Sequence, residues 1–189
     1  MSRTIHADIV VIGAGSGGLS VASGAAQLGL KTVLFEKGEM GGDCLNYGCV
    51  PSKALIAAAK VAHTLRSPGD LGISSTAEPQ IDFAAVMAHV HRAIATIAPH
   101  DSQERFEGLG CTVIRGWARF VSPQEVEVAG QRIRARRFVI ATGSRPVVPP
   151  IPGLAEVGYL TSDTVWNLRS LPKRLVVLGG GPIGSELTQ

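Results

Sequence analysis

The feature that most constrains the fold is a glycine-rich turn between an apolar strand and a helix near the N-terminus. Residues 8–13 (DIVVIG) form a nearly continuous apolar run, which is typical of a parallel strand covered on both faces. Gly13, Gly15 and Gly18 have the Gly-x-Gly-x-x-Gly spacing, and the Ala/Leu-rich residues 19–28 predict a helix. The chain is therefore expected to adopt an α/β fold in which helices cover a parallel sheet.

The surroundings of this turn predict a dinucleotide site. A second apolar strand (KTVLFEK) follows the helix and places Glu36 23 residues after Gly13. In such a motif the first glycine allows the tight turn, the second lets the backbone approach the pyrophosphate, and the third lets helix and strand pack closely. The helix N-terminus favours the phosphates, and Glu36 is expected to accept hydrogen bonds from a ribose. Because strand, helix and acid all agree, a plain structural turn is the less favoured interpretation.

Two of the three cysteines lie in the segment GGDCLNYGCVPSK, where four residues separate Cys44 from Cys49. A chain of 189 residues, 45% of them hydrophobic, buries a core without a covalent staple. A disulfide between these cysteines closes a small ring, so its stabilisation is expected near the lower end of about 2–4 kcal/mol. Structural zinc sites repeat such a pair or add histidines, which this segment does not do, so no metal ligand is predicted.

The neighbours of the cysteine pair favour redox chemistry instead. Residues 51–66 predict a helix with Pro51 in its first turn. Cys49 stands at the start of that helix, where the helix dipole favours a thiolate. Lys53 follows four residues later and lies on the same face, provided that the helix includes Cys49. We therefore interpret the pair as a redox-active dithiol.

The middle of the chain predicts helices and no metal site. Residues 67–75 (SPGDLGISS) predict a loop, and residues 81 to about 107 predict one long helix with a bend at Pro99. His89 and His91 are two residues apart, so on a helix they do not face one another. They are interpreted as surface or packing histidines.

Short β-type runs follow and predict a small antiparallel meander that returns to a buried strand. These runs are 111–121, 125–130, 131–135 and 136–143. Cys111 opens the first run and is interpreted as a small buried hydrophobe. The cluster RIRARR lacks interleaved aromatic residues, and the net charge is only +3, so it predicts a solvated strand edge rather than a nucleic-acid-binding surface.

The C-terminal part repeats the arrangement of the opening. A Pro/Gly-rich stretch, residues 143–153, predicts a linker. Beyond it, residues 173–189 (KRLVVLGGGPIGSELTQ) combine an apolar strand with Gly179, Gly181 and Gly184 in the same spacing as before. This pattern predicts the start of a second dinucleotide-binding unit.

The expected organisation is a first domain over residues 1–150 and the start of a second over residues 151–189. Residue 189 falls about one turn into the second helix, so the chain is expected to be an N-terminal part of a longer protein. No apolar run approaches the ~20 residues of a membrane span, and the N-terminus lacks a secretory pattern. We therefore expect no membrane partner and a cytoplasmic location.

Four segments, in this order, resemble the class I pyridine nucleotide-disulfide oxidoreductases, the family of dihydrolipoamide dehydrogenase, mercuric reductase and glutathione reductase. They are GAGSGG with Glu36, GGDCLNYGCVPSK, FVIATGSRP and VVLGGGPIGSE. The resemblance covers the whole chain, and GGDC with CVPSK is closest to the dihydrolipoamide dehydrogenase and mercuric reductase branch. It implies a Rossmann-like FAD-binding domain, with a parallel sheet and a small meander, followed by the start of an NAD(P)-binding domain.

The resemblance also implies an activity and roles for four residues. Electrons would pass between NAD(P)H, FAD, a Cys44–Cys49 disulfide and a disulfide or dithiol substrate. Cys49 would face the flavin, and Cys44 would meet the substrate. Lys53 would stand beside the flavin ring, paired with Glu186.

The cofactor-binding residues that the resemblance implies come from all four segments. Those expected to bind FAD are Gly13, Gly15, Ser16, Gly17, Gly18, Glu36, Lys37, Gly41, Gly42, Asp43, Gly48, Cys49, Lys53, Gly116, Ala118, Ala141, Thr142 and Gly143. Gly179, Gly181 and Gly184 would begin the site for NAD or NADP. Asp43 stands where the family usually has threonine, and Tyr47 replaces a usual small aliphatic residue.

Three alternatives remain beside a dihydrolipoamide dehydrogenase-like enzyme. One is a mercuric reductase-like enzyme that reduces a metal ion. Another is a non-catalytic FAD-binding fragment, and the third is a zinc or structural thiol protein. The full-length protein is expected to be a homodimer, and the chain alone a poor catalyst, because the family's proton-handling His–Glu pair comes from the C-terminal domain of a partner subunit.

Overall fold

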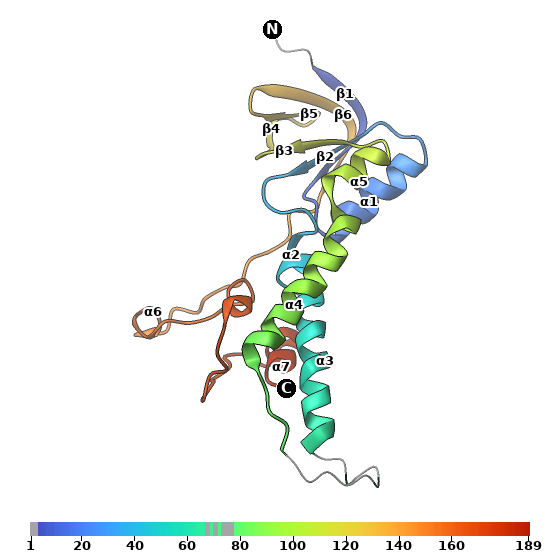
Figure 1. Cartoon of the computed structure of the whole chain (residues 1–189). Helices are drawn as coiled ribbons and strands as arrows, with labels where there is room; N and C mark the ends of the chain where they lie inside the picture. The colour runs from blue at the N-terminus through green and yellow to red at the C-terminus, as the bar shows by residue number, and fades with distance from the viewer. Residues whose placement is uncertain (1–3, 67–68, 70–71, 73–77) are drawn as a thin grey trace. The chain divides into compact units, whose positions relative to one another are not determined.

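The structure, a computed structural model shown in Figure 1, describes residues 4–66, 69, 72 and 78–189. Most of the loop predicted at 67–75 lies outside the described residues. The chain divides into two compact units, residues 1–46 with 96–145 and residues 47–95 with 146–189. Each unit thus combines segments from distant parts of the chain. The domain boundary predicted at residue 150 stays a prediction about the complete protein.

The first unit is built on one six-stranded sheet of strand order β3-β2-β1-β6-β5-β4. The neighbours β3, β2, β1 and β6 run parallel, whereas β6, β5 and β4 pair antiparallel. This confirms the α/β fold with a parallel sheet and a small meander. The strands are β1 (Ile5–Ile12), β2 (Thr32–Glu36), β3 (Thr112–Arg115), β4 (Arg119–Ser122), β5 (Glu125–Val128) and β6 (Gln131–Ile140).

The meander is smaller than the sequence predicted. The run 111–121 divides at Gly116, so that β3 joins the parallel edge beside β2 and only β4 belongs to the meander. Gly116 has φ +148°, a conformation that favours glycine, and its N–H donates to the Glu36 carbonyl at 2.9 Å. The chain can therefore leave the parallel sheet at this residue. The runs 131–135 and 136–143, predicted as separate, form the single strand β6 over 131–140.

The arginine cluster at 132–137 does not lie at a strand edge, because β6 pairs with β1 on one side and with β5 on the other. Along β6, Ile133 and Ala135 are buried, while Arg132, Arg134 and Arg136, at the alternate positions, are exposed. The strand is thus central in the sheet but only half buried. Its arginines face acids of the neighbouring strands, in the pairs Arg132–Glu127 at 3.6 Å, Arg134–Glu125 at 3.8 Å and Arg136–Asp8 at 3.5 Å.

Two apolar clusters pack on the sheet because neighbouring residues of a strand point to opposite faces. Val10 and Phe35 belong to one cluster, which the meander helps to form. Val11 belongs to the other, together with residues of α1 (Ser16–Gln27) and α5 (Gln103–Gly108). Cys111 is buried in that second cluster, as predicted, and burial raises the pKa of its thiol.

The long helix predicted over 81–107 is wrong, because this stretch forms three shorter helices. They are α4 (Phe83–Ile97), the 3-10 helix η2 (Ala98–Asp101) and α5. Pro99 lies in the first turn of η2, and Ser102 then adopts an extended conformation with φ −73° and ψ 157°. The Ser102 Oγ accepts the Arg105 N–H at 3.2 Å, so this serine begins a new helix as its N-cap.

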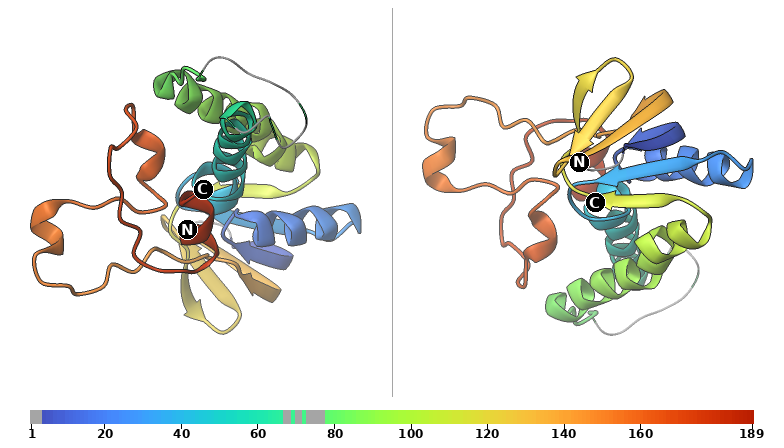
Figure 2. Two further views of the ribbon diagram at one scale, coloured as in Figure 1. Left: turned by 90° about the horizontal axis from the view of Figure 1, so that it is seen from below. Right: turned by 90° about the horizontal axis from the view of Figure 1, so that it is seen from above.

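The second unit contains α3 (Cys49–Arg66) and most of α4, which lie side by side in Figures 1 and 2. Ala54 of α3 packs with Met87 and Val90 of α4 in one buried cluster. Trp166, from the 3-10 helix η3 (Val165–Asn167), completes this cluster and is the one buried residue between 146 and 189. Val165 and Leu187 of the C-terminal segment are partly buried and pack against the same cluster.

The strand predicted at the start of residues 173–189 is wrong, since residues 171–180 contain no strand. Its apolar side chains lie in solvent, and Val176 is 82% exposed. A strand needs backbone partners, and no described strand of the second unit supplies them. The helix expected after the glycines does form as α7 (Pro182–Leu187), and the linker predicted at 143–153 has no helix or strand. One further short helix, α6 (Leu154–Val157), follows this linker.

No helix in the described ranges combines the length and the apolar character that crossing a bilayer requires.

Two substitutions on α1 test how tightly this helix packs. A Cβ on Gly18 would overlap the Gly13 carbonyl, whereas one on Gly24 meets nothing within 4 Å. We expect Gly18→Ala to lower the free energy of unfolding by about 1–3 kcal/mol, as overpacking does, and Gly24→Ala to raise it by about 0.5–1 kcal/mol. Urea unfolding measures both variants, and equal stabilities would contradict the packing described.

Candidate functional site

The three glycines of the first turn differ in backbone conformation and in the space that each leaves for a side chain. Gly13 has φ +106°, and an added Cβ would overlap the Ala141 carbonyl of the strand end beside it. Gly18 has no room for a Cβ because the Gly13 carbonyl fills that space. Gly15 is different, since its conformation is extended and a Cβ would meet only the Gly42 Cα, at an ordinary 3.8 Å. The backbone at Gly15 is thus open to a ligand rather than closed by packing.

The N-terminus of α1 is suited to a phosphate. Its N-cap, Gly15, carries no side chain to accept the first N–H groups, and the first turn contains no acidic residue. Those N–H groups carry the positive end of the dipole of a 12-residue helix. An anion placed there would accept several hydrogen bonds at once.

Glu36 is a structural part of the turn as well as a predicted ribose ligand. Its side chain is 9% exposed, and its Oε2 accepts the Ala14 N–H at 2.6 Å. Its Oε1 accepts the Gly38 N–H, also at 2.6 Å. Each carboxylate oxygen has a further lone pair, so the predicted hydrogen bonds to ribose are compatible with this arrangement.

A cavity of about 230 Å³ lies beside the turn and gathers most of the residues predicted to bind FAD. The predicted residues that line it are Gly13, Gly15, Glu36, Lys37, Gly42, Asp43, Gly116, Ala118, Ala141, Thr142 and Gly143. Ser16, Gly17, Gly18 and Gly41 belong to the same unit but do not line the cavity. Segments that are distant in the sequence therefore meet around one hollow, at the carboxyl ends of β1 and β2.

The segment that carries Gly41 and Gly42 lies directly beside the first turn. The Gly41 N–H donates to the Ala14 carbonyl at 2.9 Å, and Gly15 and Gly41 form a parallel bridge. Asp43 then lies in the first turn of α2 (Gly42–Asn46), where a carboxylate interacts favourably with the helix dipole. Its role toward a cofactor stays a prediction.

The sequence analysis did not identify four further residues that line the cavity, Ile12, Phe35, Trp117 and Ser144. Trp117 is the most notable, because its side chain is 69% exposed and the Lys37 Nζ lies 4.0 Å from its ring centroid. A cation over an indole face is a favourable contact. Trp117 lies between Gly116 and Ala118, which were both predicted to bind FAD, and this position is the sequence feature that could have identified it.

The two predicted redox cysteines lie on successive helices. Cys44 is half-buried on α2, whereas Cys49 is exposed and is the first residue of α3. The structure contains both as thiols rather than as a disulfide. Because α3 includes Cys49, Lys53, which follows four residues later, lies on the same face of this helix. Gly48 precedes the helix, and its carbonyl accepts the Ser52 N–H at 3.0 Å.

The predicted contact between Lys53 and Glu186 is confirmed. The Lys53 Nζ lies 2.5 Å from the Glu186 Oε1, and the two side chains are 61% and 35% exposed. Hydrogen bonds from Lys53 and then from Ser52 hold the pKa of Glu186 below its usual range. The contact joins α7 to α3 within the second unit. The roles assigned to these two residues stay predictions.

The second glycine turn repeats the backbone geometry of the first. Gly179 has φ +114°, and a Cβ on Gly184 would overlap the Gly179 carbonyl. Gly181, the N-cap of α7, is extended like Gly15. A dinucleotide-type turn is therefore present here although the strand before it has not formed. Its binding of NAD or NADP stays a prediction.

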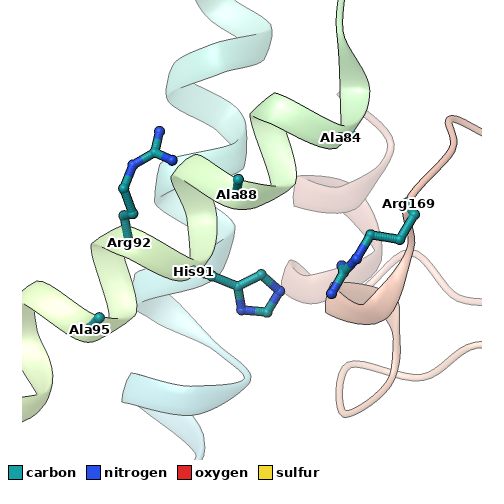
Figure 3. A pocket seen from close by; sticks show the side chains of 6 residues that line it. All are labelled: Ala84, Ala88, His91, Arg92, Ala95 and Arg169. Carbon is teal, nitrogen blue, oxygen red and sulfur yellow. The ribbon is translucent and has the colours of Figure 1, made fainter.

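A second cavity, of about 430 Å³, contains no residue predicted to be functional. It lies along one face of α4, and Figure 3 shows the residues that line it: Ala84, Ala88, His91, Arg92, Ala95 and Arg169. The His91 Nε2 lies 3.1 Å from the Trp166 carbonyl, which agrees with its interpretation as a packing histidine. The described residues contain no group of three or more metal-ligating side chains.

Comparison with known proteins finds a matching family and similar sequences. The sequence model of the pyridine nucleotide-disulphide oxidoreductases matches residues 7–189. Over 182 residues the chain is 37% identical to a mercuric reductase of Lysinibacillus sphaericus, covering 96% of this chain and 33% of that protein. Over 183 residues it is 36% identical to a dihydrolipoyl dehydrogenase of Acholeplasma laidlawii, covering 95% of this chain and 54% of that protein.

A solved structure has a similar fold. A Cu(II) complex of a cysteine-to-serine mutant of the HOCl-induced flavoprotein disulfide reductase RclA from Escherichia coli matches with a TM-score of 0.80 and 27% identity, covering 97% of this chain and 39% of that chain. The chain spans about a third to a half of the length of these relatives.

The first prediction from the site concerns Gly15. Gly15→Val places bulk where the pyrophosphate would approach, and its Cβ would have only an ordinary 3.8 Å contact with the Gly42 Cα. We expect this variant to be purified without FAD, while Gly24→Ala on the same helix retains it. Flavin absorbance per chain measures the outcome, and full FAD content in Gly15→Val would contradict the phosphate-binding role.

The second prediction concerns Glu186. Its lowered pKa means that the contact with Lys53 is present above the ordinary titration range of glutamate and is lost as the pH falls through the lower folded value. Lys53→Gln should therefore move the Glu186 titration midpoint up, whereas Lys60→Gln, on the same helix, should not. Carboxyl carbon NMR follows the titration, and an equal midpoint in all three proteins would contradict the contact.

Proposed function

This chain belongs to the pyridine nucleotide-disulphide oxidoreductase family, and we propose that it is the FAD-binding part of an enzyme that moves two electrons between NAD(P)H, FAD, a Cys44–Cys49 disulfide and a small disulfide or dithiol substrate. The observation that carries this proposal is the cavity at the first glycine turn, lined by residues expected to bind FAD. The relatives named dihydrolipoyl dehydrogenase and mercuric reductase support it. As expected from the sequence, the complete protein would be a cytoplasmic homodimer.

The residues at the cavity fit one end of FAD. A volume of about 230 Å³ is smaller than the roughly 300–1,000 Å³ of a site for a drug-sized ligand, so the cavity encloses only part of an extended dinucleotide. The N–H groups at the start of α1 would bind the pyrophosphate, and Glu36 the ribose. The backbone at Gly116 and Ala118 would face the adenine. The bound flavin supplies reversible two-electron transfer.

The cysteines would carry those electrons to the substrate by thiol–disulfide exchange. The Cys44 thiolate attacks one sulfur of the substrate disulfide, which releases the first thiol and leaves a mixed disulfide. The Cys49 thiolate then attacks the Cys44 sulfur, which releases the second thiol and forms the Cys44–Cys49 disulfide. Two electrons thus leave the dithiol and reduce the substrate. Cys49 begins α3, where the helix dipole favours the thiolate.

Lys53 and Glu186 would tune this reaction. Lys53 lies one turn after Cys49 on α3, so its ammonium is expected to stand near the thiolate and the flavin ring. The Glu186 carboxylate holds the ammonium at 2.5 Å. Removal of the carboxylate would free the lysine to move, and we expect it to change the flavin environment rather than the fold.

Reduction of a metal ion is the second candidate function. It is favoured by the relatives named mercuric reductase, which are 37% identical to this chain, and a pair of thiolates suits a soft metal ion. NADPH or NADH oxidation by the full-length protein separates the two candidates when Hg(II) and a dithiol's disulfide are compared as substrates. A flavoprotein that oxidises neither cofactor with either substrate would support a non-catalytic FAD-binding protein.

The cysteine roles predict a spectral difference between two variants. In the reduced protein, Cys49→Ser should abolish the long-wavelength charge-transfer band, because the thiolate facing the flavin is removed. Cys44→Ser should show a permanent band, since the Cys49 thiolate can no longer be oxidised to the disulfide. Cys111→Ala, at a buried cysteine outside the Cys44–Cys49 motif, should behave like the parent chain. Dithionite titration followed by visible absorbance measures all three, and the reverse pattern would exchange the two roles.

A further inference from the structure

The turn between the two cysteine-bearing helices consists of only two residues, Tyr47 and Gly48. In an uninterrupted helix the Tyr47 carbonyl would accept the N–H of the residue four positions later. That residue is Pro51, which has no N–H. The Tyr47 carbonyl, two residues before Cys49, therefore takes its hydrogen bond from outside the helix, since an unpaired backbone carbonyl would destabilise this turn.

Trp166 supplies that donor. Its indole Nε1–H donates to the Tyr47 carbonyl at 2.8 Å. The Trp166 side chain is 4% exposed, in a segment whose other residues between 146 and 189 are not buried. Its ring packs with Ala54 of α3 and with Met87 of α4. The indole is thus held in place by apolar contacts while its single polar group points to the turn before Cys49.

The backbone of Trp166 is held on the opposite side. Its carbonyl lies 3.1 Å from the His91 Nε2, and the Arg169 Nη1 donates to the same oxygen at 3.5 Å. Figure 3 shows the His91 ring on α4 directed toward the Arg169 side chain that follows η3. The position of η3 is therefore also set by a contact with α4 that does not involve the Tyr47 carbonyl.

We infer that Trp166 is a positioning residue for the redox cysteines: its indole N–H fixes the Tyr47 carbonyl and thereby the place where Cys49 begins α3. This inference rests on the proposed function, because it concerns how readily Cys49 forms a disulfide with Cys44. When the turn is held, fewer conformations must be lost on closing the disulfide. Without the indole N–H, the turn samples more conformations and the disulfide is less stable relative to the dithiol.

Exchange with glutathione tests this inference. The dithiol and one oxidised glutathione are in equilibrium with the Cys44–Cys49 disulfide and two reduced glutathione molecules. Trp166→Phe retains an aromatic ring for the packing and removes only the N–H donor. We expect its equilibrium constant for disulfide formation to fall about three- to tenfold, as the loss of one neutral hydrogen bond allows. Tyr159→Phe, which removes a hydroxyl from an exposed aromatic side chain of the same C-terminal segment, should match the parent chain.

The outcomes distinguish a failure of the proposed function from a failure of the inference about Trp166. A parent chain that forms no Cys44–Cys49 disulfide would contradict the proposed function, and the inference would fall with it. A parent that forms the disulfide while Trp166→Phe has an equal or larger constant would overturn the inference alone. Urea unfolding of Trp166→Phe and of Tyr159→Phe shows whether a change in the constant accompanies loss of the folded state.

A second measurement uses the unmodified sequence and does not depend on how Trp166→Phe folds. The chain has two tryptophans, so its indole N–H groups give two assignable NMR signals. The Trp166 signal should exchange with solvent at least about tenfold more slowly than the Trp117 signal and should shift between the dithiol and disulfide states. An equally fast exchange, or a Trp166 signal that is the same in both redox states, would overturn the inference.

Discussion

The close approach of α1 to the end of β1 is the contact on which the rest of the first unit depends. The Gly13 carbonyl occupies the space of a side chain at Gly18, and the Ala141 carbonyl occupies that at Gly13. The same turn is bridged to Gly41. Three distant segments therefore meet through bare backbone, which leaves N–H groups accessible to a phosphate and a cavity beside them. A side chain at the first or third glycine would separate these segments.

Glu36 has a structural role in the glycine turn and is also the residue proposed to bind the ribose. A carboxylate that is nearly buried needs hydrogen-bond donors, and the N–H groups of Ala14 and Gly38 supply them. These two bonds hold the start of the glycine turn and the chain after β2 in place. The acid that would bind the ribose is thus positioned by the turn that would bind the pyrophosphate.

In the second unit, an exposed segment is attached to α3 by two polar contacts on either side of Cys49. Trp166 donates to the Tyr47 carbonyl two residues before this cysteine, and Glu186 accepts from Lys53 four residues after it. Both residues belong to the segment that carries the second glycine turn. In the proposed enzyme, the part that would bind NAD(P) therefore contacts the part that would exchange thiols.

Local patterns in the sequence determined the glycine turns, the helix predicted over residues 51–66 and the Lys53–Glu186 pair, the last through the family resemblance. The structure extends that helix back to Cys49. Glycine spacing encodes backbone conformation directly, so the second turn forms even where residues 171–180 have no strand partner. Tertiary structure alone decided the division of the meander at Gly116, the central place of β6, and the anchoring role of Trp166. Strand pairing and burial depend on which distant residues become neighbours, and short-range periodicity carries no information about that.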